Sequence, residues 1–167
     1  TNKIMKKNKN LKVAIVMGSQ SDYKTMQLSA KILKKMGIKF ETKIISAHRT
    51  PKRMYDYASK VEKNNIGVII AGAGGAAHLP GMIASKTNLP VIGVPIETSA
   101  LKGLDSLYSI VQMPRGFPVA TMAIGEPGAF NAAILAIQLL GLQEPIYAQS
   151  LTKWRTKITQ KVADEPN

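Results

Sequence analysis

The sequence of 167 residues has no cysteine, only two histidines and only 5% aromatic residues. Without cysteine, disulfide bonds, thiolate metal sites and a cysteine nucleophile are excluded, which fits a reducing compartment. Two histidines are too few for a histidine-rich metal site. Few aromatic rings mean few stacking platforms for single-stranded nucleic acid, and no nucleic-acid partner is expected.

Acidic residues are also few, and they are scattered. The only close pair among the ten Asp and Glu residues is Asp164-Glu165 near the C-terminus. The sequence therefore shows no dedicated metal site and no carboxylate pair of the kind that glycoside hydrolases use. The G-x-S-x-G nucleophile elbow is absent as well.

Long apolar runs are missing too. The five apolar residues at 13–17 are fewer than the ~7–15 of a signal-peptide core. Polar and turn residues interrupt the apolar stretch 117–142, so it does not reach the ~20 uninterrupted residues of a membrane span. We expect a cytoplasmic protein without a membrane partner.

Positive charge is abundant and unevenly distributed. The net charge is +13, and residues 1–63 hold 16 Lys and Arg against 4 Asp and Glu. A basic half fits an anionic partner such as nucleic acid, a membrane surface or a phosphorylated small molecule, and equally a solvated lysine-rich surface. Residues 1–10 are predicted to be a basic, disordered lead-in, and 11–167 a single domain.

Short apolar runs alternate with helical patterns over residues 11–167. Met26, Ala30 and Leu33, for example, share one face of a helix at i, i+4 and i+7. Strands with apolar residues on both faces, separated by helices, predict a parallel five-stranded sheet in a three-layer α/β sandwich. The strands are predicted at 12–17, 40–45, 68–71, 91–94 and 119–124.

The helix predicted at 128–140 is apolar nearly all round. A helix without a polar face is buried on more than one side, which in a domain of this size indicates a subunit interface. Residues 145–162 are predicted to form a last, amphipathic helix.

Ligands of open parallel sheets bind beyond the carboxyl ends of the strands, so the loops after the first three strands are the candidates for a site. The first loop contains Ser19, Ser21 and Asp22. Hydroxyls and free N–H groups at the start of a helix can bind an anion. The alternative is an ordinary cap, in which Ser21 or Asp22 satisfies the end of the helix.

The second loop contains Ser46 and then places His48 and Arg49 together after a strand. Histidine exchanges a proton near neutral pH, and the planar guanidinium of arginine matches a phosphate. In the alternative interpretation, Arg49 is merely exposed and His48 bonds to the backbone. Thr50 followed by Pro51 predicts the start of the next helix, with Thr50 as its cap.

The third loop, 72–81, is rich in small residues that let a ligand approach the backbone, among them Ala73, Gly74 and Gly75. It formally matches a G-x-G-x-x-A dinucleotide fingerprint. That match is discounted because the loop follows the third strand and lacks a suitable acidic residue ~20 positions later.

Both histidines of the chain fall in these loops, which random placement would rarely produce. His78 is predicted either to cap the helix that follows the third loop or to contact a ligand. A fourth loop, 112–118, contains Arg115, which could reach an anion, although a role of its Pro and Gly residues in shaping the loop is favoured.

Four segments of the chain together resemble one family. The resemblance runs from about residue 13 to residue 140 and is to 5-(carboxyamino)imidazole ribonucleotide mutases, the catalytic subunits of phosphoribosylaminoimidazole carboxylase in purine biosynthesis. The segments are Met17-Gly18-Ser19-x-Ser21-Asp22, Ser46-Ala47-His48-Arg49-Thr50-Pro51, the glycine loop 72–81 and Ser106-Leu107-Tyr108-Ser109-Ile110-Val111-Gln112-Met113-Pro114.

This resemblance implies a flavodoxin-like fold and a homo-octamer whose C-terminal helix packs on a neighbouring subunit, with active sites between subunits. The implied reaction moves a carboxylate from the exocyclic nitrogen of an imidazole ribonucleotide to carbon 4 of its ring, without ATP, metal or organic cofactor. His48 falls on the family's general acid/base and Arg49 on its phosphate ligand. Ser19 and Asp22 fall on its substrate-binding loop. The residues expected to line the pocket are Ser21, Ser46, Ala73, Gly74, Gly75 and His78.

The family has a second branch, which carboxylates aminoimidazole ribonucleotide directly with carbon dioxide. That branch tends to have lysine after the loop histidine, so Arg49 favours the mutase. A basic nucleic-acid-binding module is the distant alternative. Phe130 departs from the family pattern, in which a small residue is usual.

Overall fold

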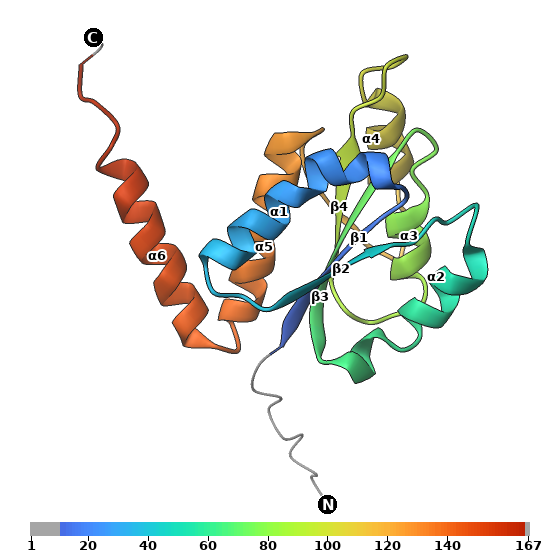
Figure 1. Ribbon diagram of the computed structural model, residues 1–167, viewed down its shortest axis with the longest axis horizontal. Helices are drawn as coiled ribbons and strands as arrows, with labels where there is room; N and C mark the ends of the chain where they lie inside the picture. Colours follow the sequence, from blue (N-terminus) through green and yellow to red (C-terminus); the bar gives the residue numbers. More distant parts are fainter. Residues whose placement is uncertain (1–10, 166–167) are drawn as a thin grey trace, which may run out of the picture.

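Five parallel strands form the centre of the protein in this computed structural model, which describes residues 11–165 (Figure 1). The order across the sheet is β2-β1-β3-β4-β5, the order of flavodoxin-like folds, and the predicted fold class is confirmed. The basic segment 1–10 lies outside the described residues. The strands are β1 (Lys12–Met17), β2 (Phe40–Ile44), β3 (Ile66–Gly74), β4 (Val91–Ile96) and β5 (Ala120–Thr121).

Helices cover both faces of this sheet (Figure 1). In the part of the chain that the structure describes, the α-helices are α1 (Tyr23–Lys35), α2 (Pro51–Ala58), α3 (Leu79–Ala84), α4 (Leu104–Val111), α5 (Glu126–Gly141) and α6 (Pro145–Thr159), and 3-10 turns are η1 (Gln20–Asp22) and η2 (Val61–Asn64). α1 and α5 pack on one face, and α2, α3 and α4 pack on the other. α6 lies outside this sandwich and packs on α5. None of the helices within residues 11–165 has the length and apolar character to cross a membrane.

The edge strand β5 is shorter than the predicted strand 119–124, because only two of its residues pair with β4. Two carbonyls of β4 still bind the segment beyond β5: Gly93 accepts the N–H of Met122 at 2.9 Å, and Pro95 accepts the N–H of Gly125 at 2.8 Å. Proline has no N–H, so β4 returns no hydrogen bond at Pro95. The ladder therefore ends early.

The apolar helix α5 is covered largely within the chain. Its buried residues pack against the sheet, α1 and α6. Phe130 on its outer side lies near Trp154 of α6, with 5.8 Å between the ring centroids. This packing explains why α5 is apolar nearly all round, so the helix does not by itself require a neighbouring subunit.

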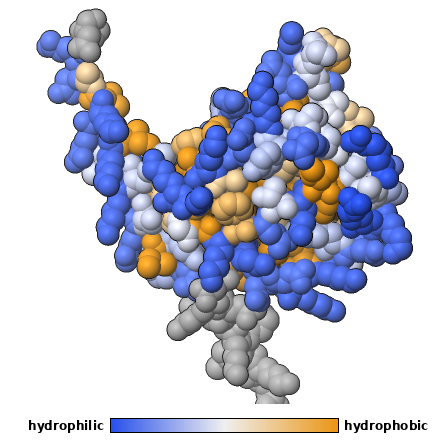
Figure 2. All heavy atoms as spheres, viewed as in Figure 1, coloured by the Kyte–Doolittle hydropathy of each residue, from blue (hydrophilic) through white to orange (hydrophobic). Residues whose placement is uncertain are grey.

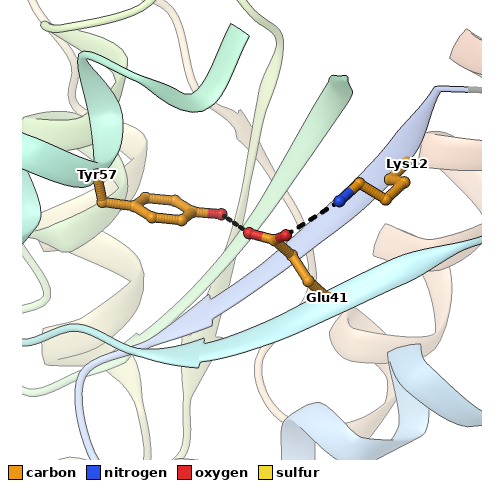
Figure 3. Close-up of polar contacts among 3 residues, drawn as sticks. All are labelled: Lys12, Glu41 and Tyr57. Carbon is orange, nitrogen blue, oxygen red and sulfur yellow. Dashed lines mark hydrogen bonds and ion pairs between the residues drawn. The ribbon is translucent and has the colours of Figure 1, made fainter. Parts of the chain in front are cut away.

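A polar cluster joins β1, β2 and α2 (Figure 3). Glu41 accepts hydrogen bonds from the hydroxyl of Tyr57 at 2.9 Å and from the ammonium of Lys12 at 3.3 Å. Burial, together with the Glu41 carboxylate, raises the pKa of Tyr57 above its ordinary value, so this hydroxyl remains a donor at neutral pH. The cluster ties α2 to β2, at the other edge of the sheet, and thereby supports the loop between them.

Candidate active site

An open cavity of about 620 Å³ lies at the carboxyl ends of β1, β2, β3 and β4. The loops that follow these four strands line it, as expected for an open parallel sheet. All ten predicted site residues are among the lining residues: Ser19, Ser21, Asp22, Ser46, His48, Arg49, Ala73, Gly74, Gly75 and His78. Arg115 is not among them.

Asp22 holds the first loop in shape. Its Oδ2 accepts the N–H of Ser19 at 3.0 Å, and the hydroxyls of Ser19 and Ser21 are 2.6 Å apart. Burial raises the pKa of the Asp22 carboxyl, and hydrogen bonds from Ser19 and Gly18 and the charge of Arg49 offset part of this rise. Asp22 therefore accepts a backbone N–H of the turn, as an ordinary cap would, and also lines the cavity.

The second loop is closed by two side-chain hydroxyls. Ser46 Oγ accepts the backbone N–H of Arg49 at 3.1 Å. Thr50 Oγ1 accepts the N–H of Ser46 at 2.9 Å and donates to the Ser46 carbonyl at 3.0 Å. Thr50 does occupy the cap position before α2, but its side chain makes no hydrogen bond to the helix end. The predicted start of this helix, with Thr50 at the cap position and Pro51 as its first residue, is confirmed, and the hydroxyl of Thr50 closes the loop rather than bonding to the helix end.

The guanidinium of Arg49 connects the first two loops. Its Nη2 donates to the carbonyl of Gly18 at 3.1 Å, and its Nε lies 3.4 Å from Ser46 Oγ. Arg49 is exposed, but it is anchored at both sides and lines the cavity. Its remaining N–H groups can bind an anion such as phosphate.

The two histidines meet in the cavity although they are 30 residues apart in sequence. His48 Nε2 lies 2.8 Å from His78 Nδ1, and the rings pack edge to face with centroids 4.8 Å apart. One of the two nitrogens must carry the hydrogen of this bond. The ring of His48 thus bonds to His78 rather than to the backbone. His78 occupies the cap position of α3 without a side-chain bond to the helix.

The loop after β4 contributes three lining residues that the sequence analysis missed: Glu97, Thr98 and Ser99. The position of this loop could have identified it, because ligands of open parallel sheets bind beyond the carboxyl ends of the strands, and β4 is one of these strands. Thr98 Oγ1 also donates to Asp105 Oδ1 at 2.7 Å. This contact ties the rim of the cavity to the start of α4.

The chemistry available in this cavity combines proton transfer with anion binding. A histidine pair can give and take a proton, and the guanidinium and hydroxyls beside it can bind a phosphorylated ligand. Within residues 11–165, no three His, Asp or Glu side chains are grouped so that they could hold a metal ion.

Comparison with known proteins places the chain in a family. The AIR carboxylase family matches residues 12–161. The chain belongs to the AIR carboxylase family. The N5-carboxyaminoimidazole ribonucleotide mutase of Vibrio cholerae is 56% identical over 155 residues, which are 93% of this chain and 96% of that protein. The protein of the same name from Escherichia coli K12 is 53% identical over 161 residues, which are 96% of this chain and 95% of that protein.

A solved structure supports the same family at greater distance. The crystal structure of Treponema denticola PurE has a TM-score of 0.81 to this chain at 28% identity, and the match covers 89% of this chain and 92% of that one. Family membership, predicted from four short motifs, is therefore confirmed. All four motifs lie within the matched residues.

Proposed function

We propose that this chain is a mutase of purine biosynthesis. It moves the carboxylate of 5-(carboxyamino)imidazole ribonucleotide from the exocyclic nitrogen to ring carbon 4, giving 4-carboxy-5-aminoimidazole ribonucleotide. The observation that carries this proposal is the contact between His48 and His78 beside Arg49 in one cavity. It is supported by relatives that are more than half identical over nearly the whole chain and are named for this reaction.

The substrate is proposed to bind with its phosphate on Arg49. Ser46 and the carbonyl of Gly18 hold the guanidinium in place, so little ordering is needed when the phosphate arrives. The hydroxyls of Ser19 and Ser21 add donors in the same loop. The carboxylate of Asp22 repels phosphate, and we therefore assign it to the ribose hydroxyls or to holding this loop.

His48 is the proposed general acid/base. When the carbamate loses carbon dioxide, the electron pair of the N–C bond stays on nitrogen, which takes a proton from His48. Ring carbon 4 then attacks the carbon dioxide, and His48 removes the proton from this carbon to restore the aromatic ring. One histidine thus ends in the state in which it began, and proton transfer of this kind contributes ~10²–10⁴-fold.

Carbon dioxide must stay beside carbon 4 between the two steps. Holding reactants in place raises their effective concentration greatly. Ala73, Gly74 and Gly75 leave room for the substrate to approach the backbone of the third loop. The mechanism uses no ATP, metal or organic cofactor, and we expect full activity in the presence of a chelator.

We also propose that the protein is a homo-octamer whose α6 packs on a neighbouring subunit. Leu101 and three residues of α4, Leu104, Tyr108 and Val111, are large, apolar and exposed. α6 extends from the sandwich with Ile146 and other apolar side chains at its surface (Figures 1 and 2). Exposed apolar faces of this kind often mark protein contacts. Light scattering is expected to give eight times the 18.1 kDa of one chain. A cytoplasmic location also remains a prediction.

A paired ultraviolet assay without ATP tests the function. One sample receives the carbamate ribonucleotide, and the other receives aminoimidazole ribonucleotide at low bicarbonate. Product from the carbamate alone supports the mutase, whereas efficient product from aminoimidazole ribonucleotide would assign the chain to the direct carboxylases. Activity should be lost in His48→Asn. Salt-sensitive DNA binding at ~0.15 M salt, without turnover, would favour the basic binding module.

A further inference from the structure

The segment 106–114 is the one motif of the family resemblance that the proposed mechanism does not use. It covers α4 except for the first two residues of the helix, together with the turn after it, and no residue of α4 lines the site cavity. Two of its serines nevertheless contact the glycine loop that does line the cavity.

Ser106 is fully buried, and its hydroxyl joins the ends of two strands. The hydroxyl donates to the carbonyl of Ile96 at the end of β4, 2.7 Å away, and accepts the N–H of Gly75 just beyond β3, 3.0 Å away. A serine hydroxyl has one hydrogen. That hydrogen is directed at Ile96, so the lone pair that receives Gly75 is held in a defined direction.

Ser109, one turn later in α4, reaches the carbonyl of the same glycine. Its one hydroxyl hydrogen is shared between two carbonyl oxygens, that of Asp105 at 2.7 Å and that of Gly75 at 3.2 Å, so the contact with Gly75 is the weaker branch. α4 therefore contacts both polar backbone groups of Gly75, the N–H through Ser106 and the carbonyl through Ser109.

Gly75 itself has no side chain to pack it in place, so its position depends on these backbone contacts, while Ala73 and Ala77 on either side of it are buried in the core. Gly75 has a φ of +69°, and a Cβ built there would meet no atom within 4 Å. From Gly75 the loop continues directly to His78: the N–H of Ala77 donates to Gly75, and the N–H of His78 donates to Ala76, both at 2.8 Å. A shift of Gly75 is thus passed to His78 through three residues.

We propose that Ser106 and Ser109 are positioning residues for the histidine pair. α4 holds Gly75, Gly75 sets the loop that carries His78, and His78 orients the imidazole of His48. The serines touch neither the substrate nor the reacting atoms. The proposal rests on the proposed role of His48, but the geometry of the pair can be measured without turnover.

The first test is imidazole ¹⁵N NMR of the whole protein, in which only two histidines give signals. Ser106→Ala is expected to change the signals of both rings. Ser29→Ala is the matched control, because Ser29 is also fully buried and its hydroxyl donates to Ala129 at 2.5 Å, between α1 and α5. Both variants should lower the Tm, and only Ser106→Ala should alter the histidine signals. Unchanged signals in folded Ser106→Ala would overturn the proposal.

The second test is kinetic. Ser106→Ala is expected to lower kcat at least tenfold and to change the pH profile of kcat, with less than a threefold change in KM, while Ser29→Ala keeps the wild-type values. Ser109→Ala should also lower kcat, and Ser109→Thr, which keeps the hydroxyl, should restore it.

If Ser106→Ala does not fold, the comparison of Ser109→Ala with Ser109→Thr tests the proposal. Wild-type kcat in Ser109→Ala, or an equal loss in Ser109→Ala and Ser109→Thr, then overturns the proposal. Absence of turnover in the wild-type protein would reject the proposed function instead, and the NMR comparison would still decide whether α4 positions the histidines.

Discussion

Replacing Gly75 with alanine tests whether the cavity at this glycine matters for activity, and the same change at Gly37 controls for the loss of stability that backbone strain causes. Gly75 has a φ of +69° and lines the cavity, whereas Gly37, which follows α1, has a φ of +72° and does not line it. At both positions a Cβ would meet no atom within 4 Å. The two glycines therefore match in backbone conformation and packing, and they differ in location.

The expected loss of stability is the same for both substitutions. The left-handed conformation costs an L-residue such as alanine roughly 1–2 kcal/mol, and the smaller freedom of alanine in the unfolded chain offsets about 0.4–1 kcal/mol. Each variant should therefore lose about 1 kcal/mol in the free energy of unfolding. For a domain of this size that corresponds to a Tm lower by roughly 2–4 °C.

Activity should separate the two variants. In Gly75→Ala the added methyl group occupies space that the substrate is proposed to use, and a tenfold loss in kcat/KM requires only about 1.4 kcal/mol. We expect at least this loss with the carbamate substrate for Gly75→Ala, and wild-type kcat/KM for Gly37→Ala. Calorimetry gives the Tm, and the ultraviolet assay gives kcat/KM. Equal kcat/KM in both variants would refute the assignment of the space at Gly75 to the substrate.

Three further substitutions test the site residues. His48→Asn should lower kcat by ~10²–10⁴-fold with little change in Tm, because the side chain is exposed; full turnover would contradict its role. Arg49→Lys keeps the charge but loses the planar fork, so KM should rise about tenfold or more, and an unchanged KM with a lower kcat would instead assign Arg49 to the chemical step. Asp22→Asn should raise the Tm at pH 7. Burial raises the folded-state pKa of Asp22 above its ordinary 3.8. The folded protein therefore has its full stability from this group below pH 3.8, where the carboxyl is protonated, and loses that stability as pH rises through the folded-state pKa. Thermal unfolding of Asp22→Asn and wild type from pH 3 to 7 should show a gain that grows with pH, and a gain of equal size at pH 3 would contradict this cause.

Local sequence patterns were sufficient for most of the sheet. The predicted strand 12–17 coincides with β1, because a strand buried on both faces leaves a continuous apolar run between polar or glycine boundaries. The strand predicted at 68–71 lies inside β3, which extends at both ends to Ile66–Gly74. The glycines at the carboxyl end of that strand predict a loop, although Gly72 and Gly74 still pair with β4.

The edge strand shows where local pattern fails. The apolar stretch 119–124 predicted six strand residues, but only Ala120 and Thr121 pair with β4. The deciding residue is Pro95, which belongs to the neighbouring strand. Whether an apolar run forms a ladder depends on the donors that its neighbour presents, and those are not encoded in the run itself.

The sequence alone predicted three of the four loops that line the cavity, because the carboxyl ends of parallel strands converge on one edge of a sheet, and it missed the loop after β4. Its four motifs also determined the family. Only the tertiary structure decided which side chains within those loops touch one another. The bond between His48 and His78 and the hold of Ser106 on Gly75 join residues about 30 positions apart. Such contacts follow from strand order and side-chain direction, which no local pattern of residues records.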